Sequence, residues 1–456
     1  MKKNVAWIVP PLLNGGGGAR TIIENANYLA THGWKSDIYI DINPSNKKNI
    51  NLKNDIISAF GKCECNVFYL SDLKDKYEVM IATYSINTPE IVYHSQANHK
   101  LYFIQDFEPW FEPMGDIYLE RENTYRLDLK GISIGKWLNY KLETEYGMEM
   151  CYFPFCANLD IYRPLSIKKE NAICFIYQPE KPRRCDKLGI QALRIVKKLK
   201  PDVKIYLYGS KNNTDFDFPV ENLGLLSVNE CNDLYNKCTI GLCISASNPS
   251  RIPFEMMASG LPVIDIYREN NLYDYTDNTV LLSVPTPAAI ASALIFVLDN
   301  PNVQVEMSKN GLKFMKNYPI KKGFEIFLNY MNSLDNDSHC TQITSSYHKK
   351  PFESTSRTKE CLNNIYNSNK IKIKHSLLNK INIEVYNPFS INEIKDLLLA
   401  KWSKPDQSDL KWIPFSKHKN KYIITFNSND LNKKDILHVY VKDINNQMYN
   451  IIQTRL

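Results

Sequence analysis

The residues best suited to chemistry lie in a polar loop and short helix between positions 245 and 264. Pro253 suits the first turn of a helix and Gly260 suits its end, so this stretch is expected to join a strand to a short helix. Glu255 falls in the first turn of that helix. Its carboxylate can either cap the helix or accept hydrogen bonds from the vicinal hydroxyls of a sugar. The position of Glu255 in the helix does not favour one of these two roles over the other.

A glycine-rich turn near the start of the chain is a second candidate for ligand binding. It includes Gly17 and Gly18, follows an apolar run and precedes a helical pattern. Glycine lets the backbone approach a ligand closely, and a helix N-terminus presents free N–H groups to an anion. The spacing is not that of a dinucleotide-binding loop or a P-loop, because no Lys-Ser/Thr pair follows. A simple flexible turn is the alternative.

An aromatic and acidic loop follows a strand expected over residues 100–106. Its stacking faces, amide and carboxylate suit a polyhydroxylated acceptor, and the alternative is a packed surface loop. The residues that we expect to bind an acceptor here are Gln105, Phe107, Glu108 and Trp110.

Short β-rich runs alternate with helical patterns twice along the chain. Strands are expected over 4–10, 35–40, 66–70, 78–84, 100–106 and 131–134, with helices over 19–32 and 136–146. The pattern restarts with strands over 172–178, 204–208, 240–245 and 262–267, and helices over 186–199, 227–237 and 253–259. Such alternation favours parallel sheets covered on both faces. We therefore predict an α/β protein with two Rossmann-like domains facing a cleft, and ligands beyond the carboxyl ends of the strands.

The domain organisation follows from these patterns. We expect an N-terminal domain over 1–165 and a second domain over 166–335, closed by helices over 288–299, 303–317 and 322–333. Polar residues 336–360 suggest a linker. Residues 361–456 form a basic appendage, α+β or β-rich, with strands over 380–386, 422–426 and 436–442 and one helix around 391–402.

Composition limits the classes of function. The net charge of +7 is modest and does not indicate nucleic acid binding. Residues 341–456 carry about 19 Lys and Arg against about 10 acidic residues, and so hold the excess. That excess is either scattered over a solvated surface or gathered in a patch for anionic lipid headgroups or a lipid diphosphate, which would be a peripheral contact at the inner face of a membrane.

The cysteines and the apolar runs bear on location. Eleven cysteines, an odd number with no paired C-x-x-C, are typical of small buried side chains in a reducing compartment. No segment approaches the roughly 20 apolar residues that span a bilayer, and the apolar start contains Pro10 and Pro11. We predict a cytoplasmic location.

The 245–264 segment resembles the donor-binding segment of the family-4 glycosyltransferases, which have two Rossmann-like domains in the GT-B arrangement. Glu255 matches the second Glu of their pattern and Gly260-Leu261-Pro262-Val263 matches its ending, whereas Ser247 stands where the first Glu is usual. Other stretches agree in order over about residues 4–330.

A closer resemblance runs through Tyr102-Phe103-Ile104-Gln105-Asp106-Phe107-Glu108-Pro109. This stretch is similar to bacterial rhamnosyltransferases of surface-polysaccharide and S-layer glycan assembly, which use dTDP-rhamnose. Gln105 stands where the common family has a His, so a catalytic His is not expected there.

The resemblance implies that the domain over 1–165 binds a glycan or lipid-linked glycan acceptor and that the domain over 166–335 binds a nucleotide-diphosphate sugar donor. It also implies retention of configuration and no obligatory metal or other cofactor. It implies catalytic roles for Asp106, Arg184 and Lys187, with the two cations at the diphosphate, where a basic helix start is the alternative. Glu255 would bind the ribose or deoxyribose. The other residues implied to bind the donor are Gly17, Gly18, Arg183, Gly209, Leu225, Ser247, Pro253 and Phe254.

Two rival functions stay open. A nucleotide-sugar epimerase on the same fold would need a dense set of acid/base carboxylates and His at the cleft, which the sequence does not suggest. A non-catalytic glycan-binding or scaffold protein would account for Ser247 and Gln105 standing where the family has Glu and His.

Overall fold

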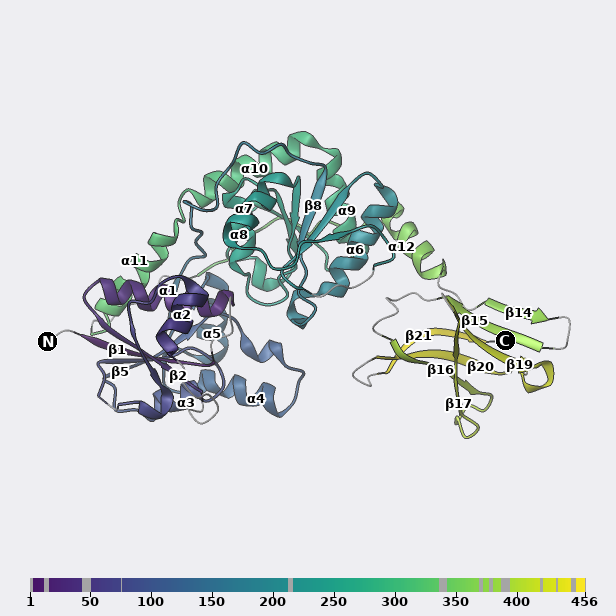
Figure 1. Ribbon diagram of the computed structural model, residues 1–456, viewed down its shortest axis with the longest axis horizontal. Helices are drawn as coiled ribbons and strands as arrows, with labels where there is room; N and C mark the ends of the chain where they lie inside the picture. The colour runs from purple at the N-terminus through teal and green to yellow at the C-terminus, as the bar shows by residue number, and fades with distance from the viewer. Residues whose placement is uncertain are drawn as a thin grey trace.

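The computed structural model describes most of the chain. The described residues are 3–11, 16–42, 51–74, 76–211, 216–335, 343–368, 372–376, 380–386, 394–418, 421–431, 434–443 and 448–455. They form two parallel-sheet domains and a third, antiparallel one (Figure 1).

The first domain is a seven-stranded parallel sheet in the order β3-β2-β1-β4-β5-β6-β7. Its strands are β1 Asn4–Val9, β2 Lys35–Ile40, β3 Asn66–Tyr69, β4 Val79–Ala82, β5 His99–Ile104, β6 Lys130–Ile134 and β7 Met150–Phe153. Its helices are α1 Gly17–Thr31, α2 Leu52–Phe60, α3 Thr88–Tyr93, α4 Asp116–Asn123 and α5 Lys136–Tyr146, with the 3-10 turns η2 Leu70–Asp72, η3 Glu108–Phe111 and η4 Thr124–Arg126.

The central strands of this sheet are apolar because both faces are covered. In β1, Trp7 packs with Ile22 of α1 on one face, and Ile8 packs with Leu138 of α5 on the other. The two helices therefore sandwich the sheet.

The second domain is a six-stranded parallel sheet in the order β10-β9-β8-β11-β12-β13. Its strands are β8 Ala172–Ile176, β9 Lys204–Tyr208, β10 Glu221–Asn222, β11 Ile240–Leu242, β12 Val263–Ile266 and β13 Val280–Ser283. Its helices are α6 Asp186–Leu199, α7 Val228–Lys237, α8 Arg251–Ala258, α9 Pro287–Asp299 and α10 Pro301–Met315, with the 3-10 turns η5 Pro182–Arg184 and η6 Glu269–Asn271.

Helix α11, Ile320–Asn332, follows α10 but packs on the first domain. Its Phe327 is fully buried and its ring lies 5.7 Å from Trp7, 5.6 Å from Phe103 and 6.3 Å from Phe153. Trp34 Nε1 donates to Asn332 Oδ1 at 3.2 Å. The chain thus returns to its first domain after the last strand of the second sheet (Figure 1).

The segment expected as a linker contacts the second domain wherever it is described. Residues 336–342 lie outside the described residues. Tyr347 is buried and Phe352 bridges to Ser283 of β13. Helix α12, Ser356–Ser368, then packs against α9 and α6 and leads into the third domain.

The third domain is a β-sandwich of two four-stranded antiparallel sheets, β14-β15-β19-β18 and β17-β16-β20-β21. Its strands are β14 Lys372–Ser376, β15 Lys380–Tyr386, β16 Ile394–Trp402, β17 Lys411–Pro414, β18 Ser416–His418, β19 Lys421–Asn427, β20 Ile436–Asp443 and β21 Met448–Arg455, with the 3-10 turn η8 Ser428–Asp430. The helix expected around 391–402 is wrong, because that segment is strand β16. Alternate residues Leu397 and Leu399 fill the sandwich core, which a strand permits and a helix does not.

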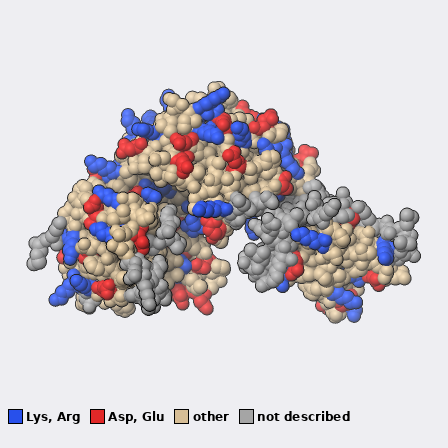
Figure 2. Space-filling view, viewed as in Figure 1, with Lys and Arg blue, Asp and Glu red and all other residues tan. Residues whose placement is uncertain are grey.

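Charged side chains of both signs are mixed on one face of the molecule. Figure 2 shows Lys and Arg interspersed with Asp and Glu on the visible face, rather than gathered in one basic patch. Within the part of the chain that the structure describes, no single helix is long and apolar enough to cross a membrane. Only α9 and α10 together pass that test, as a pair bent by 99°.

Candidate functional site

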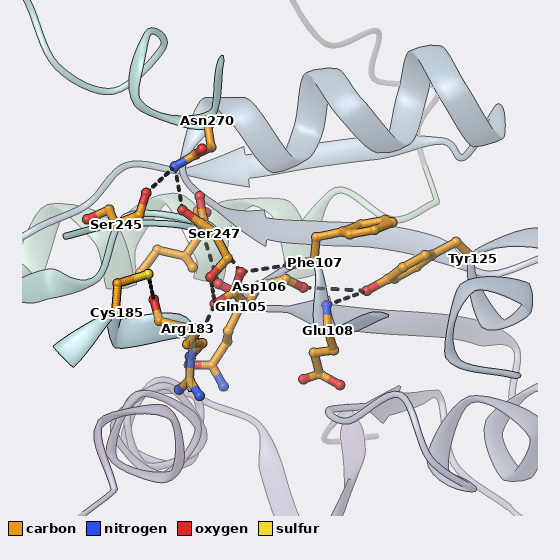
Figure 3. A network of polar contacts seen from close by, with 12 residues as sticks. Gln105, Asp106, Phe107, Glu108, Tyr125, Arg183, Cys185, Ser245, Ser247 and Asn270 are labelled. Atoms are coloured by element: carbon orange, nitrogen blue, oxygen red, sulfur yellow. Dashed lines mark hydrogen bonds and ion pairs between the residues drawn. The ribbon is translucent and has the colours of Figure 1, made fainter. Parts of the chain in front are cut away.

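Asp106 joins the two parallel-sheet domains at the carboxyl end of β5. Its Oδ2 accepts from Ser247 Oγ and its Oδ1 from the Asn248 N–H, both at 2.9 Å, and both residues belong to the second domain (Figure 3). The Phe107 N–H also donates to Oδ1 at 2.9 Å. Burial raises the pKa of this carboxyl, and the nearby Arg183 is the main opposing influence. Asp106 is therefore a half-buried carboxylate held by both domains.

Two arginines stand beside that carboxylate on the turn η5 that follows β8. Arg183 Nε lies 3.9 Å from Asp106 Oδ2, and its guanidinium stacks over Phe111 of the first domain, 4.3 Å from the ring centre. Arg184 Nε is buried and has no hydrogen-bond partner among the described residues. Burial and then the charge of Arg183 lower the pKa of Arg184. The pair concentrates positive charge at the carboxyl edge of the second sheet.

A buried polar network fixes the loop that receives Asp106. Asp265 at the end of β12 accepts from the Ser245 N–H at 2.8 Å and from Ser245 Oγ at 2.6 Å. Tyr275 Oη donates to the same carboxylate at 2.9 Å. Asn270 Nδ2 donates to the carbonyls of Ser245, at 2.9 Å, and Ser247 (Figure 3). The loop that contains Ser245 and Ser247 is thus fixed by hydrogen bonds to Asp265 and Asn270 of its own domain.

Glu255 lies in α8 beside a second cross-domain contact. Arg251 Nη1 donates to Glu24 Oε2 of helix α1 at 2.9 Å, and Arg251 Nε lies 3.9 Å from Glu255 Oε1. Burial raises the pKa of Glu255, and Arg251 and then Tyr162 oppose the shift. The charge of Glu255 is therefore partly balanced within the protein.

The first turn of α1 faces the same region. The helix begins at Gly17, and its N-cap Gly16 has no side chain to satisfy the free N–H groups. Gln105 Nε2 donates to the Gly18 carbonyl at 3.2 Å, and a Cβ at Gly18 would stand 3.4 Å from that nitrogen. Glycine at this position lets Gln105 lie against the helix.

The other expected acceptor residues lie mostly inside the first domain. Phe107 is 1% exposed and packs between Tyr125 and Trp110. Glu108 is also buried, where it accepts from the Ser85 N–H at 2.7 Å, and burial raises its pKa to about 7. Trp110 is half-buried, and the Arg268 guanidinium lies 5.7 Å from its ring. Only Gln105 and Trp110 keep part of their side chains accessible.

The remaining expected donor residues are placed differently. Pro253 and Phe254 are buried, and Phe254 stacks on Phe155 at 4.7 Å, so neither side chain faces the cleft surface. Gly209 follows β9 with φ of 102° and accepts from Gln178 Nε2 at 3.3 Å. Leu225 is exposed after β10, and Lys187 is exposed in the first turn of α6. Asp106, Arg183, Arg184 and Ser247 are the expected residues that the structure brings together.

Three residues at this junction were not expected from the sequence. Asn248 follows Ser247 and Arg251 lies four residues before Glu255, so both were close to recognised positions. Asp274 accepts from the Lys136 N–H at 2.9 Å and the Trp137 N–H at 3.4 Å, which caps helix α5 from the opposite domain. Nothing local to Asp274 signals that contact.

One group of side chains in the described part of the chain has the spacing of a metal site. His99 Nε2 lies 2.9 Å from Asp335 Oδ1 and 3.9 Å from Glu78 Oε1. His99 begins β5, so the group stands at the edge of the sheet opposite Asp106. An ordinary ion-pair cluster accounts for it, and it takes no part in the cleft.

Two parallel-sheet domains whose strand ends meet across a junction of this kind define the GT-B fold. WaaG, described as a glycosyltransferase involved in lipopolysaccharide biosynthesis, shares the fold with a TM-score of 0.52 and 12% identity. The match covers 73% of this chain and 100% of WaaG.

Comparisons with known proteins identify similar sequences and structures. The family of the WsaF C-terminal domain matches residues 171–295. The O-antigen biosynthesis protein RfbC of Myxococcus xanthus is 26% identical over 321 residues, 68% of this chain and 25% of RfbC. This chain therefore spans about a quarter of that relative. A mutant of S. aureus TarM, solved with Fondaparinux, alpha-GlcNAc-glycerol and UDP, has a TM-score of 0.57 and 11% identity, covering 73% of this chain and 100% of TarM.

Proposed function

We propose that this chain is a glycosyltransferase that transfers a sugar from a nucleoside-diphosphate donor to a growing bacterial cell-surface glycan. The donor that we propose is dTDP-rhamnose, with retention of configuration. The bond between the anomeric carbon and the diphosphate oxygen breaks, a bond to an acceptor hydroxyl oxygen forms, and the hydroxyl proton leaves. Matches to the WsaF C-terminal domain and to an O-antigen biosynthesis protein support the glycan context.

The observation that carries the proposal is the buried Nε atom of the half-buried Arg184. Its Nε has no partner among the described residues, and Arg183 on the adjacent position adds a like charge. A buried donor without a partner is costly, so the arrangement calls for an anion. A diphosphate at the carboxyl edge of the second sheet would satisfy it and would be stabilised as negative charge develops on the leaving group. Exposed Lys187, in the first turn of α6, would add a third cation.

The surrounding residues then take definite roles. The N–H groups of Gly17 and Gly18 receive no hydrogen bond from an N-cap side chain, and Gly18 lies beside Gln105. These N–H groups suit a phosphate or the reacting sugar. Glu255 would accept from the ribose or deoxyribose hydroxyl of the nucleotide. Asp106 would orient the sugar or the acceptor from the domain junction, where water is excluded when the domains meet.

The test is turnover with a defined donor. Purified protein, dTDP-rhamnose and a rhamnosylated acceptor should yield dTDP and an extended glycan, followed by mass spectrometry and by the anomeric NMR signal of the product. Turnover with another nucleotide sugar alone would overturn the donor assignment. A changed sugar on the nucleotide with no acceptor present would instead identify an epimerase. Tight binding of donor and glycan without turnover would identify a non-catalytic binding protein.

A further inference from the structure

Asn248 is a second-domain residue whose side chain is bonded to the first domain. It lies in the loop between β11 and α8 and is 5% exposed. Its Nδ2 donates to the Gln105 carbonyl at 2.9 Å and to the Ile134 carbonyl at 3.0 Å. Its backbone N–H donates to Asp106 Oδ1 at 2.9 Å. All three acceptors follow or end strands of the first sheet.

These contacts determine which way the amide faces. Two carbonyl oxygens can be paired only by an NH₂ group, so Nδ2 must point at the first domain. The Oδ1 atom is then turned away from those carbonyls. It is buried and has no hydrogen-bond partner within the described residues. An acceptor left in this state calls for a donor that arrives with a ligand or a water.

The position of this acceptor matches the far end of a nucleotide sugar. Asp106 contacts both the Asn248 N–H, at 2.9 Å, and Arg183 Nε, at 3.9 Å. The main chain of Asn248 and the guanidinium of Arg183 therefore contact the same carboxylate, which places Asn248 next to the arginine pair. A diphosphate at the arginines would leave the attached sugar beside the amide. A carbonyl oxygen accepts hydrogen bonds, so the group that it recognises is a hydroxyl and not an anion.

We propose that Asn248 Oδ1 accepts a hydrogen bond from a hydroxyl of the donor sugar, and that this recognition depends on closure of the two domains. The inference rests on the proposed function, because the ligand is the sugar of the nucleotide donor. Closure is required since the amide is oriented only by carbonyls of the opposite domain. Asn248 is thus a specificity-determining residue, and it makes full binding of the sugar dependent on the closed state.

The experiment compares binding of dTDP-rhamnose with binding of dTDP alone by calorimetry. Wild type should bind the sugar nucleotide more tightly than dTDP. In Asn248→Ala this preference should fall by about five- to tenfold, with the affinity for dTDP changed less than about twofold. The isosteric Asn248→Asp should lose the preference as well, because a carboxylate cannot donate to the two carbonyls. The exposed amide of Asn329 on α11 supplies the matched control, Asn329→Ala, which should behave as wild type.

The outcomes separate the two proposals. Equal weakening of dTDP and dTDP-rhamnose in both variants would mean that Asn248 only supports the loop, and would overturn this inference while leaving the proposed function intact. A preference for dTDP-rhamnose that both variants retain would overturn it too. Wild type that binds neither ligand, nor UDP or UDP-glucose, would overturn both proposals. If Asn248→Ala fails to fold by circular dichroism, the Asn248→Asp result decides.

Discussion

Arg184 has a buried Nε atom that finds no hydrogen-bond partner among the described residues. Solvent weakens the repulsion between neighbouring arginines that are exposed. Arg184 Nε is buried, so its repulsion with Arg183 is screened less. Arg183 is held by Asp106 and by the ring of Phe111, so it is already engaged with the first domain. The two arginines at the carboxyl edge of the second sheet therefore differ in role. Arg183 contacts the first domain, and Arg184 is available for an anion.

Replacing Arg184 should therefore reduce catalysis more than stability. We expect Arg184→Ala to lower kcat/KM about 10- to 100-fold, the range for a hydrogen bond to a charged group. Arg184→Lys should recover part of that loss, since it keeps the charge but not the fork of donors. Steady-state kinetics with the active donor measures it. The exposed Arg357→Ala on α12 is the control, and an equal loss in that variant would contradict the assignment.

At the scale of elements, helix α5 takes its N-terminal cap from the other domain. Its own N-cap, Gly135, offers no side chain, and Asp274 supplies the carboxylate instead. A Cβ at Gly135 would stand 2.9 Å from Asp274 Oδ2, so glycine is needed for this approach. Burial raises the pKa of Asp274 to about 6, although the two N–H groups favour its charged form.

The cap predicts a particular dependence of stability on pH. A carboxyl whose pKa is higher in the folded than in the unfolded protein stabilises the fold at low pH, and that contribution is lost as pH rises through the folded value. With a shift from 3.8 to about 6, the loss is about 3 kcal/mol between about pH 4 and pH 6. The difference in urea unfolding free energy between wild type and Asp274→Asn should fall by that amount over this window. A difference that is flat from pH 4 to pH 7 would refute the prediction.

Helix α11 makes the first domain dependent on residues far along the chain. Phe327 is fully buried against three aromatic rings of the first sheet. Truncation of such a side chain removes apolar contacts and leaves a cavity.

We expect Phe327→Ala to lower the free energy of unfolding by about 3–5 kcal/mol. Phe327→Leu should cost less, because most of the volume is retained. Val305 on α10 is 68% exposed, so Val305→Ala should change the free energy by less than about 0.5 kcal/mol. Urea unfolding of the three variants checks this order, and equal losses would show that α11 does not support the first domain.

The elements differ in how far the sequence predicts them. The expected ranges 35–40, 136–146, 186–199 and 204–208 agree with β2, α5, α6 and β9, because buried apolar runs and amphipathic spacing are local signals. The expected strands do not include β7 and β13, which are the last strands along one edge of their sheets and are defined by pairing with a single neighbouring strand. Strand β16 was taken for a helix because Ile394–Trp402 contains Leu, Ala and Lys, which favour helices until packing decides.

The sequence also predicts some residues of the candidate site and not others. Asp106, Arg184 and Ser247 were predicted from residue type and resemblance, and the first two lie where strands of parallel sheets end. The contacts that join the domains were not predictable. Asn248 is bonded to a residue 114 positions away and Arg251 to one 227 positions away, and no local pattern reports such partners.

At the scale of the whole molecule, the third domain is a separate packing unit. Its core is built from its own strands, with Ile383, Leu399 and Val439 fully buried between the two sheets. Helix α12 belongs by packing to the second domain and ends at Ser368. The β-sandwich is therefore attached at one point of the chain rather than built into the fold (Figure 1).

Removal of residues 369–456 should leave the rest of the protein folded. We expect the unfolding temperature of the two parallel-sheet domains to change by less than about 2 °C, because no core residue is lost. Turnover of a soluble acceptor should persist in the truncated chain. Turnover of a lipid-linked acceptor by the same chain tests whether the β-sandwich binds the glycan or a membrane surface. Calorimetry of the full chain should show a second transition that the truncated chain lacks, and a single shared transition would contradict the division.

The return of α11 also has a consequence during synthesis of the chain. The first sheet emerges from the ribosome early, but Phe327, which covers Trp7, Phe103 and Phe153, is translated only after all the strands of the second sheet. Until then the nascent first domain displays an uncovered aromatic surface, of the kind that molecular chaperones bind. The first domain therefore cannot be completed before the second sheet has been synthesised, although its own seven strands are all translated earlier.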